Sequence, residues 1–184
     1  MGPGTMTRFA VCVAAALFVA KPLRAQVRSG GGFDVTLGQH IINGGFVEFR
    51  RGMMLDALGA IPVRASPKRS VIVAAGAGGV LGGNADSCLL RPDGGCAPKG
   101  NFGFVNALGG VALPLGNTTL RALAGPAIYD GGGDTSIGLQ ARIDFSAPLL
   151  VHFGIGAMLR ATVLPSHGGD RLTMVAFGGS LTLR

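Results

Sequence analysis

An acid, an imidazole and a hydroxyl occur close together in the second half of the chain, as Asp144, His152 and either Ser136 or Ser146. Such a set could form a hydrolytic triad, in which the carboxylate orients the imidazole and the imidazole activates the hydroxyl. The same charged groups could instead pair with one another in a protein interior, because an isolated buried charge is costly. The elements that carry these side chains decide between the two interpretations.

Residues 135–163 alternate between apolar and small or polar side chains, with an interruption at Pro148. A period of two over about ten residues predicts β-strands with two different environments. Strands of this length, apolar on one face only, are typical of transmembrane β-barrels. The residues expected to face lipid are Ile137, Leu139, Ile143, Phe145, Val151, Phe153, Ile155 and Leu159.

The opposite face of these strands carries charged residues that we expect to meet inside the barrel. Folding the chain about the loop 130–134 places Arg121 opposite Asp144, and folding it about Pro148 places Asp144 opposite His152. Enzymes that act on lipid place their catalytic groups where lipid reaches them, so an inward position favours a structural plug over a triad. The expected lumen charge cluster comprises Arg121, Asp144, His152, Arg142, Arg160, Asp34, Asp56 and Arg184.

The whole chain divides into eight such segments, which predict an all-β fold. The expected strands are residues 33–40, 55–64, 71–81, 101–115, 118–129, 135–146, 150–163 and 171–183, whereas residues 46–54 are expected to be an extension or an excursion of the first loop. Short connections alternate with longer or Gly/Asp-rich ones, as barrels with short periplasmic turns require. We therefore predict an eight-stranded antiparallel up-and-down transmembrane β-barrel with both termini on the periplasmic side.

Composition and the N-terminal segment agree with a membrane barrel. Charged residues make up 14% of the chain, against about 25% in soluble domains. The net charge of the chain is +7, but its basic residues alternate with apolar ones. They do not form the clustered basic patch that is typical of a nucleic-acid-binding surface. Residues 9–20 form an apolar core too short to span a membrane, which predicts a secretory signal peptide over residues 1–25 and a barrel domain over 26–184.

Two cysteines remain after removal of the signal segment, Cys88 and Cys96. An even count in a secreted chain predicts a disulfide, which would stabilise this small loop by about 2–3 kcal/mol. A metal site is not expected, because two cysteines without a nearby histidine provide too few ligands. His40 and His167 are expected near the outer rim as loop or lumen residues, and we expect no cofactor.

The signal segment, the strand parity and the turn asymmetry over residues 33–184 resemble the small eight-stranded outer-membrane barrels of the OmpA and OmpX type. This resemblance implies the outer membrane of a Gram-negative-type envelope, with outer-membrane lipid and the barrel assembly machinery as partners. The expected function is non-enzymatic, structural or based on interactions of the outer loops, with the lumen plugged by polar side chains. A lipid-active barrel enzyme and a soluble periplasmic lipocalin-like barrel that binds an apolar ligand remain as alternatives.

Overall fold

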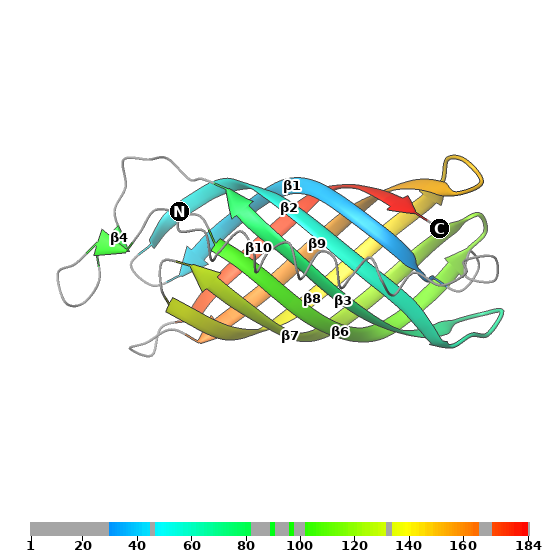
Figure 1. Ribbon diagram of the computed structural model, residues 1–184, viewed down its shortest axis with the longest axis horizontal. Coiled ribbons are helices and arrows are strands. Elements are labelled where there is room, and N and C mark those ends of the chain that lie inside the picture. The colour runs from blue at the N-terminus through cyan, green and yellow to red at the C-terminus, as the bar shows by residue number, and fades with distance from the viewer. Residues whose placement is uncertain are drawn as a thin grey trace, which may run out of the picture.

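The computed structural model describes residues 30–44, 47–81, 89–90, 96–97, 102–131, 134–165 and 171–183. Nearly all of them lie in β-strands (Figure 1). No helix among these residues is long and apolar enough to cross a lipid bilayer. The predicted signal segment 1–25, as well as Cys88, His167 and Arg184, lies outside the described residues.

Eight long strands form a closed barrel in the order β1-β10-β9-β8-β7-β6-β3-β2, with every neighbouring pair antiparallel. The barrel strands are β1 (Gly32–Gly44), β2 (Val47–Arg64), β3 (Ser70–Leu81), β6 (Phe102–Leu115), β7 (Thr118–Gly131), β8 (Asp134–Pro148), β9 (Phe153–Pro165) and β10 (Arg171–Leu183). Each strand therefore pairs with its neighbours along the chain. The predicted eight-stranded antiparallel meander is confirmed.

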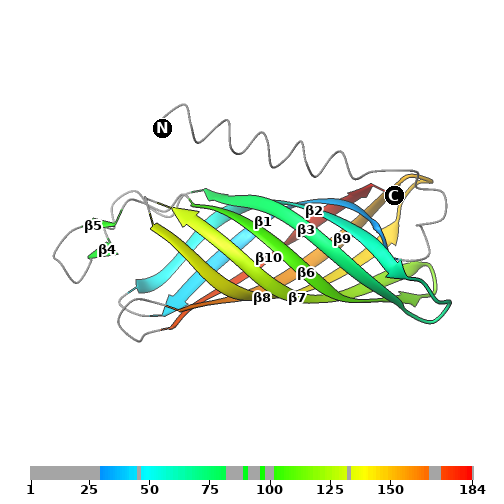
Figure 2. The same cartoon turned by 60° about the horizontal axis from the view of Figure 1, so that its bottom comes forward.

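The two ends of the barrel differ in the length of their connections. Short turns join β2 to β3, β6 to β7 and β8 to β9 at one end, which we call the turn end; β1 also begins there and β10 also ends there. Gly116, in the turn between β6 and β7, has a φ of 64°, a backbone conformation that favours glycine. At the opposite end, the loop end, two small additional strands, β4 (Leu89–Leu90) and β5 (Cys96–Ala97), pair beyond the barrel (Figure 2).

The first hairpin is longer than the clear alternation in the sequence. Residues 47–54, which were expected to belong to the first loop, are instead part of β2, which pairs with β1. The register shifts between Ile42 and Gly44 in this hairpin, and again between Pro62 and Arg64 where β2 meets β3. A proline lacks the N–H that a central strand needs, so its position next to a bulge is expected.

The hairpin between β8 and β9 corrects one expectation. The second strand begins at Phe153 rather than at residue 150, and the chain turns through residues 149–152 rather than at Pro148. The N–H groups of Leu149 and Leu150 both donate to the carbonyl of Phe153, at 2.9 and 3.0 Å, and Phe153 donates back to the carbonyl of Leu150 at 3.3 Å. Val151 and His152 therefore lie in the turn and not on the strand.

Candidate functional site

The inward face of the barrel carries the charged residues. Along β8, outward residues are exposed and inward residues are buried, with strict alternation from residue 137 to residue 146. An eight-stranded barrel is just wide enough for side chains to fill its interior. Polar and charged residues that are buried in this way include Asp34, Thr36, His40, Asp56, Asn106, Arg121, Gln140, Arg142, Asp144, Arg160, Thr162 and Thr182.

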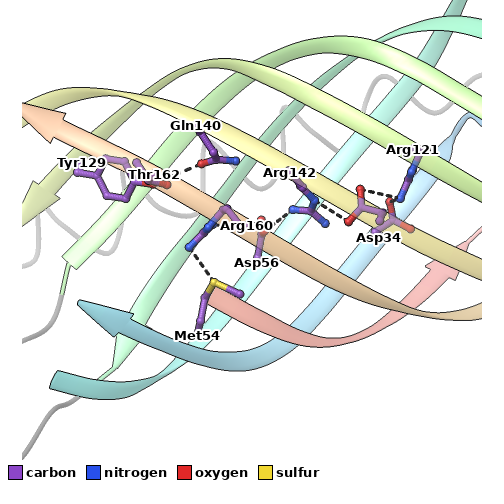
Figure 3. A network of polar contacts seen from close by, with 10 residues as sticks. Asp34, Met54, Asp56, Arg121, Tyr129, Gln140, Arg142, Arg160 and Thr162 are labelled. Carbon is purple, nitrogen blue, oxygen red and sulfur yellow. Dashed lines mark hydrogen bonds and ion pairs between the residues drawn. The ribbon is translucent and has the colours of Figure 1, made fainter. Parts of the chain in front are cut away.

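Six of these residues form a continuous chain of ion pairs, which we call the ion-pair ladder: Asp34, Arg121, Asp144, Arg142, Asp56 and Arg160. Figure 3 shows most of its members strung along the lumen. Acids and bases alternate at every step. The ladder joins five strands, β1, β2, β7, β8 and β9, that surround the lumen.

At the turn end the ladder begins with Asp34, near the start of β1. The Arg121 guanidinium pairs with the Asp34 carboxylate and lies 3.3 Å from Asp144 Oδ2. The second oxygen of Asp34 accepts a hydrogen bond from the Thr182 hydroxyl at 2.6 Å. Arg121 and Asp144 are also direct partners in the register of β7 and β8. This end of the ladder therefore ties β1, β7, β8 and β10 together.

In the middle of the lumen, Arg142 connects two carboxylates. Its Nε donates to Asp144 Oδ1 at 2.7 Å, and its Nη1 pairs with Asp56 from β2. Asp56 Oδ2 also lies 3.5 Å from Arg160 Nη1. The planar guanidinium presents several donors in a fixed geometry and can engage two carboxylates at once.

Toward the loop end the ladder meets sulfur and aromatic groups. Arg160 Nη2 donates to Met54 Sδ at 2.8 Å, and its guanidinium carbon lies 4.2 Å from the centre of the Phe104 ring. A cation over an aromatic face is attracted by the ring quadrupole. Beyond it, the Tyr129 hydroxyl lies 2.8 Å from the Thr162 hydroxyl and donates to Gln140 Oε1 at 3.3 Å.

The ladder has no net charge, because it contains three arginines and three aspartates. Every member is almost completely buried, and Arg142 is 1% exposed. Removing one partner from such an assembly leaves an uncompensated buried charge, which is strongly unfavourable. The geometry is that of a sealed structural network with internal charge balance.

Apolar side chains fill the rest of the lumen, which was expected to be a purely polar plug. One cluster near the turn end lines β2, β3, β6 and β7, and includes Leu58, Ile72 and Leu108. A second, toward the loop end, includes Met54, Phe104, Tyr129, Met158 and Met174. Methionine adapts to irregular spaces, which suits packing against the Arg160 end of the ladder.

One member of the expected lumen cluster, His152, does not lie in the lumen, and a second, Arg184, is not among the described residues. His152 is exposed in the turn, and the β9 partner of Asp144 is Met158 instead. The error comes from the position of the turn, because a hairpin centred three residues later changes every cross-strand pair. The structure brings the other six members together.

The hydrolytic triad is not assembled. Asp144 is buried and engaged by two arginines, whereas His152 is exposed beyond the end of β8. Ser146 is buried inside the barrel, where it pairs with Thr119 and Gly156 in the strand register. The acid and the imidazole of the expected triad therefore lie apart.

Several residues of the polar network carry no charge and were not singled out from the sequence. Tyr129, Gln140 and Thr162 form the loop-end hydrogen bonds, and Thr182 supports Asp34. All four have the inward parity of their strands, so the period-two pattern was the signal that could have found them. The sequence gives no sign of which inward residues reach one another across the lumen.

Histidine and other ligand types do not gather into a metal site in the described part of the chain, where no group of three or more His, Cys, Asp or Glu could hold an ion. His40 is buried in the lumen toward the loop end, where its ring packs edge-on against Phe102, the first residue of β6, with centroids 5.9 Å apart.

The outward face is apolar on all eight strands. We call this surface the apolar belt; its exposed members include Leu37, Leu55, Val73, Val111, Ile128, Ile143, Leu159 and Phe177, one from each strand. Seven of the residues expected to face lipid lie on this surface, namely Ile137, Leu139, Ile143, Phe145, Phe153, Ile155 and Leu159. Val151 is exposed as well, but in the turn.

Among the charged residues whose side chains the structure describes, none lies in the middle of this surface. Six of these charged residues form the ladder. The remaining four lie at strand ends or in a turn: Arg64, Lys68, Arg69 and Asp130. The polarity of the barrel is thus the inverse of that of a soluble protein.

No protein-family model and no curated protein matches the chain. Among solved structures, the chain is similar to Ail, the attachment invasion locus protein of Yersinia pestis, with 13% identity, a TM-score of 0.47 and coverage of 83% of this chain and 96% of Ail. It is also similar to Neisserial surface protein A, NspA, with 14% identity, a TM-score of 0.43 and coverage of 83% and 97%. Likeness at this level assigns no function to the chain.

Proposed function

We propose that this chain is a non-enzymatic transmembrane β-barrel of a Gram-negative-type outer membrane, of the OmpA and OmpX type. Its role is structural or based on interactions of its outer loops, and its lumen is a sealed, charge-balanced plug. The observation that carries the proposal is the inverted polarity: an apolar belt outside and an ion-pair ladder inside. In water this arrangement would expose the apolar surface of every strand.

The alternatives fit the same geometry less well. A lipocalin-like barrel would need Arg121, Arg142 and Arg160 on its water-facing exterior, yet all three are buried. A lipid-active enzyme would need catalytic groups where lipid reaches them, and Asp144 and His152 lie apart.

The proposal also includes features that the sequence and its resemblance to small outer-membrane barrels imply. Cleavage of residues 1–25 would deliver the chain to the periplasm, and a disulfide between Cys88 and Cys96 would then form in an oxidising compartment. The barrel assembly machinery would insert the barrel, and outer-membrane lipid would surround the belt. The paired strands β4 and β5 lie beyond the loop end, where outer loops would meet partners.

Membrane fractionation with heat-modifiable gel migration tests this proposal. Expressed in a Gram-negative host, the protein should stay in the outer-membrane fraction after a urea wash and migrate differently before and after boiling. Two aspartates on the belt, Ile155→Asp with Leu159→Asp, should abolish insertion, because charges facing lipid are unfavourable. Two aspartates in turns, Ser66→Asp with Asn117→Asp, should not. Recovery of the native chain in the soluble periplasmic fraction would contradict the proposal.

A further inference from the structure

The turn between β8 and β9 is apolar at its tip, unlike the two other turns at the turn end. Leu149, Leu150 and Val151 are 59%, 66% and 81% exposed. Turns that face water commonly contain Gly, Asn, Asp, Ser or Pro, each for a conformational or hydrogen-bonding reason. The turn between β6 and β7 follows that rule with Gly116 and Asn117.

The apolar tip lies next to the apolar belt, with Pro148 and the exposed His152 at its two borders. Phe145 on β8 and Phe153 on β9 are outward and exposed, and Leu149 to Val151 connect them. On the other side of the ring the belt ends abruptly. There Val63 and Val71 lie on either side of the turn between β2 and β3, which is bordered by Arg64 and contains Lys68 and Arg69, all exposed.

These two turns lie on opposite sides of the barrel. In the strand order of the closed sheet, the β8–β9 junction and the β2–β3 junction are separated by the same number of strands in both directions. Figure 1 shows both turns at the end where β10 finishes. The apolar surface therefore extends farther toward the turn end on one side than on the other.

The backbone of the apolar turn is also suited to a low-dielectric environment. Within the described part of the chain, the three backbone hydrogen bonds that lie outside the strands are all in this turn, between residues 149 or 150 and Phe153. Polar backbone groups that enter lipid must be satisfied internally. The turn at residues 65–69 has no such bond and carries cations that need water or anionic headgroups.

We infer that the Leu149-Leu150-Val151 turn is embedded in the lipid leaflet at the turn end, so that the barrel leans in the membrane with its β8–β9 side deeper than its β2–β3 side. This inference rests on the proposed membrane location. The occupant of the apolar turn is lipid at the boundary of headgroups and acyl chains, at a depth of roughly 5–10 Å. The basic turn remains at the level of the phosphates, where its cations meet negative charge.

The chain has no tryptophan, so a single indole reports on one position. Three variants are needed: Leu150→Trp at the tip, Ser66→Trp in the basic turn, and Leu159→Trp on the belt. Each full chain is reconstituted into two sets of phosphatidylcholine vesicles, one brominated close to the headgroup and one brominated deep in the acyl chains. Heat-modifiable migration checks that each variant is folded, and Val151→Trp replaces Leu150→Trp if that variant does not fold.

We expect position 150 to be quenched most by the lipid brominated close to the headgroup, position 159 to be quenched most by the lipid brominated deep in the acyl chains, and position 66 to be quenched by acrylamide. Quenching at 159 but not at 150 would overturn the inference and leave the membrane barrel intact. A blue-shifted emission at 150 without bromine quenching would also overturn it, since a second copy of the chain would then cover the turn. Absence of lipid quenching at 159 would overturn the proposed function itself.

Discussion

Arg142 is the residue on which the interior most depends. Its guanidinium is the link between the Asp144 end of the ladder and the Asp56 end, and it is 1% exposed. Asp56 retains a contact to Arg160 at 3.5 Å and Asp144 retains one to Arg121 at 3.3 Å. Both remaining contacts are long, so neither carboxylate would be well compensated without Arg142.

Replacing this guanidinium tests the ladder directly. Arg142→Met should lower the free energy of unfolding by about 3–5 kcal/mol, because breaking a buried ion pair leaves uncompensated charge. Urea titration of the reconstituted barrel, followed by the gel shift between folded and unfolded forms, measures the change. Arg64→Met removes an exposed arginine at the end of β2 and should change stability by less than about 0.5 kcal/mol. Equal effects of the two substitutions would show that the ladder contributes nothing specific.

At the scale of the strand, β8 and β9 illustrate what alternation can predict. From Phe153 onward, exposed and buried residues alternate with the same parity as in the sequence pattern, because parity does not depend on where the preceding turn is centred. The register between β8 and β9, in contrast, depends entirely on where the turn is centred. Leu150 and Val151 are apolar and β-favouring, so nothing in the local pattern separated them from the strand, and Pro148 offered a more obvious turn.

The first hairpin was uncertain for a different reason. Residues 47–51 mix charged and apolar side chains without a clear period, yet they pair with β1. Cross-strand hydrogen bonds from an adjacent strand can extend a strand through a stretch that its own sequence marks weakly. Contacts across the lumen, such as Arg142 with Asp56, depend on barrel closure. The residue pattern along a single strand therefore could not predict them.

Two adjacent glycines in β6 provide a test at the same scale. A Cβ added at Gly110 would collide with the backbone carbonyl of Ala122 on β7, whereas one added at Gly109 would meet nothing within 4 Å. Gly110→Ala should therefore destabilise the barrel by about 1–3 kcal/mol, as overpacking does. Gly109→Ala should stay within about 0.5 kcal/mol of the native chain. The same urea titration compares them, and an equal cost at both positions would refute the close approach of β6 and β7.

The whole molecule combines a neutral, filled interior with an uncharged, apolar exterior. The ladder lets polar side chains occupy the lumen without net charge, and the two apolar clusters occupy the remaining volume. Both features follow from one parity shared by eight strands. The opposite parity would place the apolar side chains in the lumen and the charged side chains against lipid. That parity is therefore the central claim.

Two neighbouring residues on β6 provide the sharpest test of this parity. Phe104 points into the lumen and is 3% exposed, whereas Val105 points outward and is 38% exposed. In the tryptophan-free chain, Val105→Trp should be strongly quenched by brominated acyl chains in reconstituted vesicles, and Phe104→Trp should not be. Strong quenching of the indole at position 104 with none at position 105, or equal quenching at both, would contradict a barrel that turns its apolar face to lipid and its charges to the lumen.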